Sequence, residues 1–310
     1  MKISVAMCTW NGASYLPAQL TSILKQTRKP DELVVCDDVS SDTTKKLLDS
    51  FASNSDFPVR VIENSTRLGS TGNFAKAISI CTGEVIVLAD QDDIWDSAKL
   101  AVTEEHFQNR PSLGGIFTDA KLIDQHGNEL NESLWSAVGF NYRKKSALHE
   151  GRGLDSLIQG NYVTGATLAF RSCWRSLLLP IPSGWVHDHW IATLLSVATQ
   201  LDFDQAPLIK YRIHPLQQFG VKKNWRRIDN TIYLRAAQRS DEVAARFKQF
   251  DAGGQHEAEE RFCAISKHFR TRGTLPKERS KRIAAILQEA LNGNYFRYSM
   301  GIKSIFRDLI

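Results

Sequence analysis

The first hundred residues alternate short runs of β-favouring side chains with segments of helical spacing, and this alternation constrains the fold more than any other feature. Strands are predicted at residues 3–8, 33–36, 59–62 and 84–89. Helices are predicted between them, where apolar residues recur at helical spacing or a cap-like Ser-Asp-Thr-Thr segment occurs. Strands that alternate with helices in this way predict a mostly parallel sheet with right-handed crossovers.

Polar side chains gather where each of these four strands ends. They are residues 9–11 after the first strand, Asp37 and Asp38 after the second, 64–69 after the third and 90–93 after the fourth. In an open parallel sheet, the ligand crevice lies beyond the carboxyl ends of the strands. The four clusters therefore predict one binding site at a single edge of the sheet.

The fourth cluster places Asp90, Asp92 and Asp93 directly after a buried strand. Carboxylates this close repel one another and raise each other's pKa unless a cation lies among them. Oxygen ligands suit Mg²⁺ or Mn²⁺, and Mg²⁺ is often shared with a bound phosphate. Two alternatives are capping of the next helix and the phosphatase nucleophile of haloacid dehalogenases. The phosphatase motif normally follows a first strand, whereas this one follows the fourth.

The regular alternation of strand-like and helix-like segments becomes less clear after about residue 112. We predict a strand at 115–118, a turn at 124–128, a β-like stretch at 162–170 and a helix at 190–198 that follows a loop. From residue 221 the chain becomes charged and helix-favouring, with interruptions at Gly253-Gly254 and at residues 273–276. The sequence therefore predicts a helical C-terminal region.

The positive charge of the chain is concentrated in that region. The net charge is +5, and residues 221–310 hold 19 Lys and Arg against 10 Asp and Glu. A basic tail of this kind is a solvated helical face, or it binds anionic lipid or nucleic acid. The chain has 310 residues of which 42% are hydrophobic, which is enough for a large core. Its five cysteines are scattered and contain no CxxC pair, so neither a disulfide framework nor a zinc site is expected.

No apolar run approaches the roughly 20 residues that span a bilayer. Residues 1–5 lead into a strand and lack the hydrophobic region of a signal peptide. We therefore expect a cytoplasmic protein. A peripheral contact with the inner membrane face through residues 292–308, which mix aromatic, basic and apolar side chains, is one interpretation of the tail. A helix packed on the rest of the chain or on another subunit is the alternative.

Several motifs, in order, resemble those of the inverting glycosyltransferases of family 2, in their rhamnosyltransferase-like form. The matching segments are VAMCTWNGASYL, VVCDDVSSDTT, ENSTRLGSTGNFAKA, ADQDDIW, GNYVTGATLAF, VHDHW and YRIH, and they cover roughly residues 3 to 220. The resemblance implies an α/β GT-A fold: a Rossmann-like, mostly parallel nucleotide-binding sheet with a mixed acceptor-side region. It implies a catalytic domain at 1–220, divided at 110/111 into nucleotide-sugar and acceptor halves, followed by a basic helical region at 221–310.

The resemblance also implies a role for each polar residue that matches a motif. The set that would bind the donor nucleotide and its diphosphate is Thr9, Asn11, Tyr15, Asp37, Asp38, Arg67, Gly69, Asn73, Asp90 and Gln91. The set that would hold Mn²⁺ or Mg²⁺ is Asp90, Asp92 and His214. Turn and cap chemistry explains some of these residues equally well, Arg67 could simply be solvated, and His214 could be structural.

The acceptor side of the resemblance centres on Asp188, which would be the general base. The remaining acceptor contacts it implies are Trp95, Asn161, Thr164, Gly165, His187 and Trp190. Alternatively, Asp188 is only a helix cap, and the two tryptophans belong to the core. Asp93 has two interpretations, a contact with sugar hydroxyls or a cap of the next helix.

The resemblance implies transfer of a sugar, rhamnose or another hexose, from a nucleotide diphosphate to a saccharide or lipid-linked acceptor in surface polysaccharide synthesis. No nucleic acid partner is expected, and a homo-oligomer is left open. One alternative is a nucleotidyltransferase on a related sheet, but the loop after the first strand has one glycine and no Lys or Arg. Another is a non-catalytic carbohydrate-binding relative, which should lack the metal carboxylates or the base.

Overall fold

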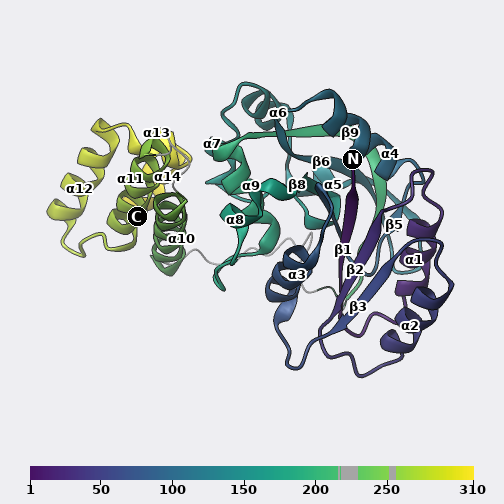
Figure 1. Cartoon of the computed structure of the whole chain (residues 1–310). Helices are drawn as coiled ribbons and strands as arrows, with labels where there is room; N and C mark the ends of the chain where they lie inside the picture. The colour runs from purple at the N-terminus through teal and green to yellow at the C-terminus, as the bar shows by residue number, and fades with distance from the viewer. Residues whose placement is uncertain (216, 218–229, 251–255) are drawn as a thin grey trace. The chain divides into compact units, whose positions relative to one another are not determined.

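The computed structural model describes residues 1–215, 217, 230–250 and 256–310. The chain forms two compact units, one of Met1–Gly153 with Asn161–Lys222 and the other of Leu154–Gly160 with Lys223–Ile310 (Figure 1). The predicted boundary at residues 220/221 and the predicted interruption at Gly253-Gly254 lie outside the described residues. Within those residues, no helix is both long and apolar enough to cross a bilayer.

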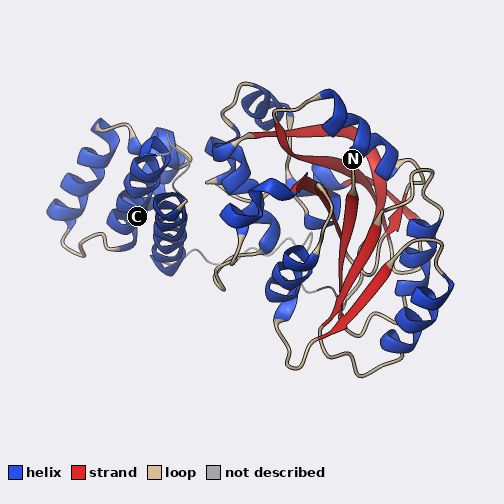
Figure 2. Cartoon of the chain, in the orientation of Figure 1, coloured by secondary structure: helices blue, strands red, loops and turns tan. Residues whose placement is uncertain are grey.

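The first unit is built on one twisted sheet, which Figure 2 shows in red. Among the described residues it has nine strands in the order β3-β2-β1-β4-β8-β6-β9-β5, with β7 paired to β6. The strands are β1 (Ile3–Thr9), β2 (Glu32–Asp37), β3 (Val59–Glu63), β4 (Val85–Ala89), β5 (Ile94–Trp95), β6 (Leu113–Ile123), β7 (Glu129–Ser133), β8 (Leu168–Arg171) and β9 (Gln200–Arg212).

The sheet has a parallel half and a mixed half, as predicted. β1 pairs in parallel with both β2 and β4, and β2 pairs in parallel with β3. β8 is antiparallel to β4 and to β6, β5 is antiparallel to β9, and β6 runs parallel to β9. β2 and β4 are buried along their whole length, because helices cover both faces of this half.

Helices cover both faces of the parallel half. α1 (Leu16–Leu24) and α2 (Thr44–Asn54) lie on one face, and α3 (Gly69–Ile80) lies on the other (Figure 1). Hydrophobic side chains recur on α1 at Leu16, Leu20 and Ile23 and are all buried, which explains the predicted helix. The other helices of this unit are α4 (Lys99–Asn109), α5 (Leu134–Val138), α6 (Tyr142–His149), α8 (Arg175–Leu178) and α9 (His187–Ala198), and α7 (Gly153–Leu157) begins at its boundary.

Two predicted elements on the acceptor side are wrong in extent. The β-like stretch 162–170 forms a strand only from Leu168, because a 3₁₀ turn at Gly165–Thr167 precedes it and the Thr167 amide donates to the Thr164 carbonyl, 2.9 Å away. The helix predicted at 190–198 begins three residues earlier, at His187. Its first turn is polar, so apolar spacing did not reveal it, and Asp188 lies in that turn rather than in a loop.

The described part of the second unit is helical, as predicted. Its helices are α10 (Asn230–Gln249), α11 (His256–Gly273), α12 (Arg279–Leu291), α13 (Asn294–Tyr298) and α14 (Ile302–Leu309). α10 and α11 pack along each other, and α12 packs against α13 and α14. The predicted tail at residues 292–308 forms two helices, α13 and α14, rather than one. The helix is interrupted before α14 at Gly301, whose φ of 57° is in the region that favours glycine.

Candidate active site

The carboxyl ends of β1, β2 and β4 lie side by side at one edge of the sheet. β1 lies between the other two, and its register pairs Thr9 with Asp37 and Met7 with Ala89. Asp90 follows Ala89 directly, so three of the predicted polar clusters meet at this edge. The structure therefore brings together the side chains that the sequence placed at separate strand ends.

Thr9 and Asp37 build the first loop at this edge. One Asp37 oxygen accepts from Thr9 Oγ1 (2.7 Å) and from Ser40 Oγ (2.6 Å), and the other accepts from the Ser40 amide (2.8 Å). Asn11 supports the same loop with its side-chain oxygen, which accepts from the Ser41 amide (2.8 Å). These three predicted nucleotide contacts therefore hold the backbone of the loops that follow β1 and β2.

Asp38 anchors the loop that precedes α3. Its oxygens accept from the backbone amides of Leu68 (2.7 Å) and Gly69 (2.8 Å) and from the Asn64 side chain (2.9 Å). Asn73, on α3, accepts from the Asn64 side chain at 2.9 Å and is fully buried. Gly69 has a φ of 72°, which an L side chain rarely adopts. This loop is therefore fixed to the end of β2 by a buried carboxylate.

Arg67 lies flat against the loop after β1. Its guanidinium stacks 3.6 Å from the centroid of the Trp10 ring and its Nε lies 4.0 Å from Asp38. A stacked, half-exposed guanidinium keeps N–H groups available for a phosphate. Gln91 locks the same loop, because its side chain accepts from the Trp10 amide (2.8 Å) and donates to the Trp10 carbonyl (3.1 Å). A Cβ at Gly12 would lie 2.2 Å from the Gln91 side-chain oxygen, so a larger residue there would displace the Gln91 amide from Trp10.

The carboxylates after β4 share their site with Asp188. Burial, together with the negative charges of Asp92 and Asp188, raises the pKa of Asp90 to about 8. Asp92 Oδ2 contacts His214 Nε2 at 2.8 Å, and the His214 ring packs 4.8 Å from the ring of Tyr15. The structure therefore unites Asp90, Asp92, His214 and Tyr15 with the base predicted on α9.

Asp93 differs from its two neighbours. Its side chain is 1% exposed, and its Oδ1 accepts from the Arg212 amide at 3.0 Å. Burial, then the charges of Asp92 and Asp90, raise its pKa well above the usual range. The next helix, α4, begins at Lys99 with Ala98 as its cap residue, so Asp93 does not cap it. Asp93 therefore links the loop after β4 to Arg212 on β9. The structure assigns it this structural contact in place of the predicted sugar contact or helix cap.

Asp188 lies in the first turn of α9 and is held by three residues. Oδ1 accepts from the Asn161 side chain (2.9 Å) and the His189 amide (2.6 Å), and Oδ2 accepts from the Gly165 amide (3.1 Å). Burial raises the pKa of Asp188 to about 6 despite these hydrogen bonds. Asn161 and Gly165, which the sequence assigned to the acceptor, therefore position the carboxylate. Thr164 contributes its carbonyl to the adjacent 3₁₀ turn.

Three predicted acceptor contacts are enclosed in the protein interior. Trp190 is 0% exposed and donates from Nε1 to the Leu178 carbonyl, and Trp95 is 4% exposed within the hydrophobic core. His187 stacks on Phe74 with ring centroids 4.0 Å apart, and burial lowers its pKa to about 3. For these three side chains the prediction of a sugar contact is wrong in this structure, because no ring face is open to a ligand.

Sequence reasoning missed two charged residues beside the carboxylates. Arg212 donates from Nε to the Asp92 carbonyl (2.8 Å), and its guanidinium lies 4.8 Å from the Tyr15 ring. Its place in the YRIH segment was the available signal. Lys99 is fully buried opposite Asp93, and burial lowers its pKa to about 7. A lysine in a charged helix gave no sequence signal of burial.

The donor atoms at this edge suit a divalent cation. In the described ranges no group of three or more His, Cys, Asp or Glu side chains is arranged as a metal site. Asp90 and Asp92 nevertheless supply oxygen ligands, and their mutual repulsion is the condition that a bound cation relieves. His214, in contact with Asp92, adds a nitrogen donor. The chemistry of the site therefore fits Mg²⁺ or Mn²⁺.

The half-parallel, half-mixed sheet of the first unit has the GT-A architecture. Known structures share this architecture across the chain. The S. aureus TarS 1-349 structure in complex with UDP-GlcNAc aligns with a TM-score of 0.60, 15% identity, and coverage of 97% of this chain and 84% of that chain. The mannosyltransferase PcManGT from Pyrobaculum calidifontis, in complex with GDP-Man and Mn²⁺, aligns with a TM-score of 0.50, 16% identity, and coverage of 94% and 75%.

The amino-acid sequence of the first unit identifies the family. Residues 4–153 match the model described as glycosyl transferase family 2, and this part of the chain belongs to that family. The UDP-Glc:alpha-D-GlcNAc-diphosphoundecaprenol beta-1,3-glucosyltransferase WfgD of Escherichia coli is 36% identical over 98 residues, or 32% of this chain and 38% of that protein. The chain spans less than half the length of the curated relatives it matches. The family match favours a glycosyltransferase over the nucleotidyltransferase alternative.

Proposed function

We propose that this chain is an inverting glycosyltransferase that moves a hexose from a nucleotide diphosphate sugar to a saccharide or lipid-linked acceptor. The observation that carries the proposal is the proximity of a half-buried carboxylate on α9 to the carboxylates after β4. The charge of Asp188 helps to raise the pKa of Asp90, which supports a single site that contains both groups. WfgD, whose name includes a lipid diphosphate acceptor, supports surface polysaccharide synthesis as the setting.

Asp188 is the general base in this proposal. Oδ2 accepts one hydrogen bond, from Gly165, and so retains a lone pair for the proton of an acceptor hydroxyl. Its pKa of about 6 leaves it mostly ionised near neutral pH and still basic enough to take a proton. The hydroxyl oxygen attacks the anomeric carbon as its proton passes to Asp188. The bond from that carbon to the diphosphate oxygen breaks on the opposite side, which inverts the configuration.

The donor lies along the ends of β1, β2 and β4 in this proposal. Arg67 presents its stacked guanidinium to the diphosphate, and the Asp38-anchored loop shapes the pocket for the nucleotide. Asp90 and Asp92, with His214, would hold Mn²⁺ or Mg²⁺, as the Mn²⁺ in the PcManGT complex suggests. When bound, that cation stabilises the charge that develops on the departing diphosphate.

Substitution of the base tests the proposal. We expect Asp188→Asn to lower transfer by roughly 10²–10⁴-fold, because the proton of the hydroxyl then has no acceptor. Nucleotide binding, measured by calorimetry, should stay within about twofold, which corresponds to a small free-energy difference. Asp124→Asn is the matched control, because Asp124 lies in a turn between β6 and β7. Normal turnover by Asp188→Asn would overturn the assignment of the base.

A ligand panel identifies the donor. UDP, GDP, dTDP and their sugars, each with Mn²⁺, are compared by thermal shift, because a ligand that binds only the native protein raises its apparent stability. We expect one nucleotide to stand out by several degrees and to lose its effect in EDTA. A protein that no nucleotide stabilises would instead be the non-catalytic carbohydrate-binding relative.

A further inference from the structure

The last helix of the chain, α14, exposes its apolar side chains and buries its polar ones. Ile302, Phe306 and Leu309 are exposed, Phe306 to 63%, whereas Ser304 and Asp308 are buried. With about 100° between successive residues, the three apolar side chains fall within a sector of about 60°. A helix of a water-soluble unit normally turns such a sector toward the core. α14 has the reverse orientation.

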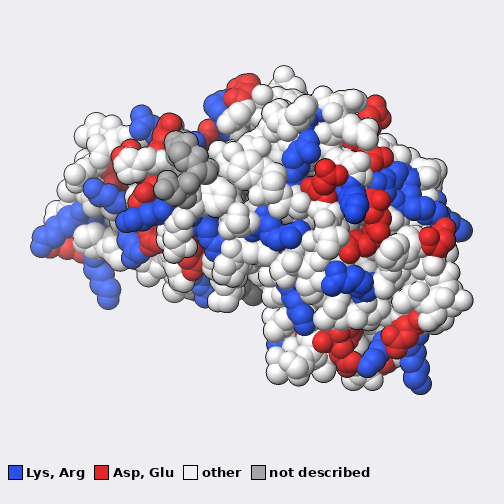
Figure 3. Space-filling view, in the orientation of Figure 1, with Lys and Arg blue, Asp and Glu red and all other residues white. Residues whose placement is uncertain are grey.

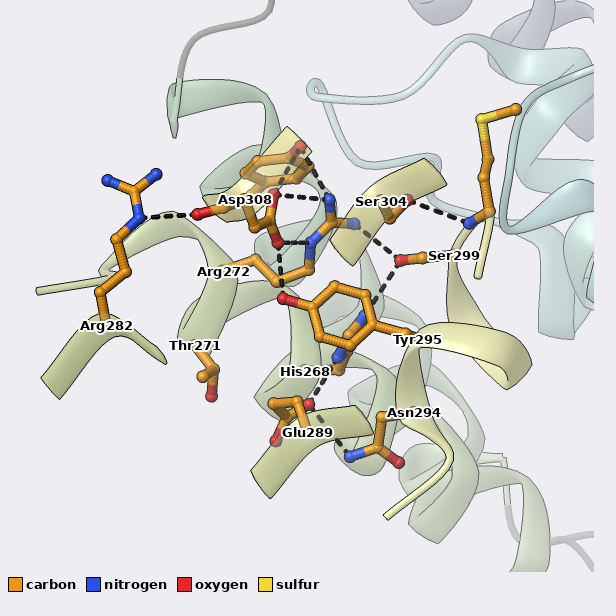
Figure 4. Close-up of polar contacts among 12 residues, drawn as sticks. His268, Thr271, Arg272, Arg282, Glu289, Asn294, Tyr295, Ser299, Ser304 and Asp308 are labelled. Carbon is orange, nitrogen blue, oxygen red and sulfur yellow. Dashed lines mark hydrogen bonds and ion pairs between the residues drawn. The ribbon is translucent and has the colours of Figure 1, made fainter. Parts of the chain in front are cut away.

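A buried ion pair fixes this orientation. Arg272 on α11 donates from Nε to Asp308 Oδ2 (2.6 Å) and from Nη2 to Asp308 Oδ1 (3.0 Å). Tyr295 OH donates to the same carboxylate at 2.7 Å, and Arg282 Nε donates to the Asp308 carbonyl at 2.6 Å (Figure 4). Rotating α14 to bury its apolar side would separate this pair and leave a buried charge without its partner. The exposed apolar sector is therefore built into the packing of the unit.

The apolar surface extends beyond α14. Phe296, on α13, and Met300, in the turn that leads into α14, are both more than half exposed, and the Phe296 ring lies against Gly301. We call the five side chains Phe296, Met300, Ile302, Phe306 and Leu309 the tail face. α12, which packs against α14, carries a further exposed apolar row at helical spacing, namely Ile283, Leu287 and Leu291.

The charges around the tail face are almost all positive. Residues 277–310 contain seven basic side chains, Lys277, Arg279, Lys281, Arg282, Arg297, Lys303 and Arg307. Their three acidic residues are Glu278, Glu289 and Asp308, of which the last two are buried. Lys303 and Arg307 are exposed and follow the apolar sector around the circumference of α14. Figure 3 shows basic side chains on the visible surface around α12.

We propose that the tail face docks on an anionic lipid surface, with its apolar side chains in the boundary between headgroups and acyl chains. Lys303 and Arg307 would reach lipid phosphates while their stems cover apolar surface. A second copy of the chain fits less well, because a two-fold contact through this face would set these like charges against their own copies. The proposal goes beyond the transfer reaction, since it involves the helical unit alone and holds whether or not the proposed chemistry is correct.

Vesicle flotation of the full chain tests the proposal. We expect the protein to float with vesicles of phosphatidylcholine and phosphatidylglycerol, and to float poorly with phosphatidylcholine alone. The double variant Ile302→Ser/Phe306→Ser should lower partitioning by at least about tenfold, because each side chain loses its burial in lipid. Lys303→Gln/Arg307→Gln should lower it by about tenfold on the anionic vesicles only.

Matched controls separate the tail face from general surface properties. Tyr142→Ser removes an 82% exposed aromatic ring from the first unit, and Lys25→Gln/Lys46→Gln removes two exposed charges there. Both should float like the parent. Binding that the tail-face variants leave unchanged would overturn the proposal. So would light scattering that shows a dimer dispersed by Ile302→Ser/Phe306→Ser, or a lowered melting temperature of that variant, since the face would then be covered by protein.

Discussion

Carboxylates that are wholly or partly buried occur in both units of this protein, and their surroundings differ. In the second unit, Asp308 accepts two hydrogen bonds from the Arg272 guanidinium and one from Tyr295, so its charge is matched inside the protein. In the first unit, Asp90 lies among other carboxylates, and burial with their charge raises its pKa to about 8. Unmatched buried charge is costly to a folded protein. The difference therefore distinguishes a carboxylate that stabilises the fold from carboxylates to which we assign a ligand.

Asp92→Ala should produce the largest effect that this comparison predicts. Removing the carboxylate paired with His214 should lower transfer by about 10³-fold and weaken nucleotide binding in Mn²⁺, because it deletes a proposed cation ligand. Calorimetry in EDTA is the control, since parent and variant should then bind nucleotide alike. An equal loss in Mn²⁺ and in EDTA would assign Asp92 a purely structural role.

Asp308→Ala should destabilise the protein by about 3–5 kcal/mol in urea unfolding, because Arg272 stays buried without its partner. Asp241→Ala is the matched control in the same unit. Its partner, Arg270, is mostly exposed, and we expect a change below about 1 kcal/mol. Similar effects from the two substitutions would show that burial does not distinguish these ion pairs.

The pH profile of transfer should sharpen the comparison further. Asp188 acts in its charged form and its pKa is raised to about 6, so its basic form is lost as the pH falls through 6. We expect the rate to fall about tenfold per unit below pH 6 and to level off above pH 7. A rate that falls only below pH 4 would mean that burial does not raise the pKa of this carboxyl in the working enzyme.

Asp93→Asn should have the smallest effect. The raised pKa of Asp93 favours its neutral form, and an asparagine keeps the Oδ1 acceptor for the Arg212 amide. We expect stability within about 1 kcal/mol of the parent and nearly unchanged transfer. Loss of transfer with a normal fold would show that Asp93 acts on the substrate, and the carboxylate loop would then have three functional members.

Local pattern was sufficient to predict the parallel half of the sheet. β1, β2 and β4 each contain a run of apolar residues bounded by polar ones, so each strand can be predicted on its own. β9 could be anticipated only at its end, because it carries Asp202, Asp204 and Lys210 among apolar residues and is stabilised by pairing with β6. Its existence depends on contacts that sequence spacing does not encode.

The sequence predicted which residues lie at the candidate site better than it predicted what each residue contacts. Asp38 was expected among the nucleotide contacts, and the structure adds that it accepts from the amides of Leu68 and Gly69, about thirty residues away in the chain. Trp95 and Trp190 could equally have been surface or core residues, and only the packing around them makes them core. The roles assigned to Asp188 and the metal-binding pair stay predictions until they are measured.

The ion pair that orients α14 has a practical consequence for engineering this protein. Deleting a C-terminal segment is a common way to improve the solubility of a protein when that segment exposes apolar side chains. Here, deleting α14 would also remove Asp308, and Arg272 and Tyr295 would lose the carboxylate that they share. Polar replacements at Ile302, Phe306 and Leu309 would leave that carboxylate in place. A more soluble form is therefore better obtained by substituting the exposed apolar residues of α14 than by deleting the helix.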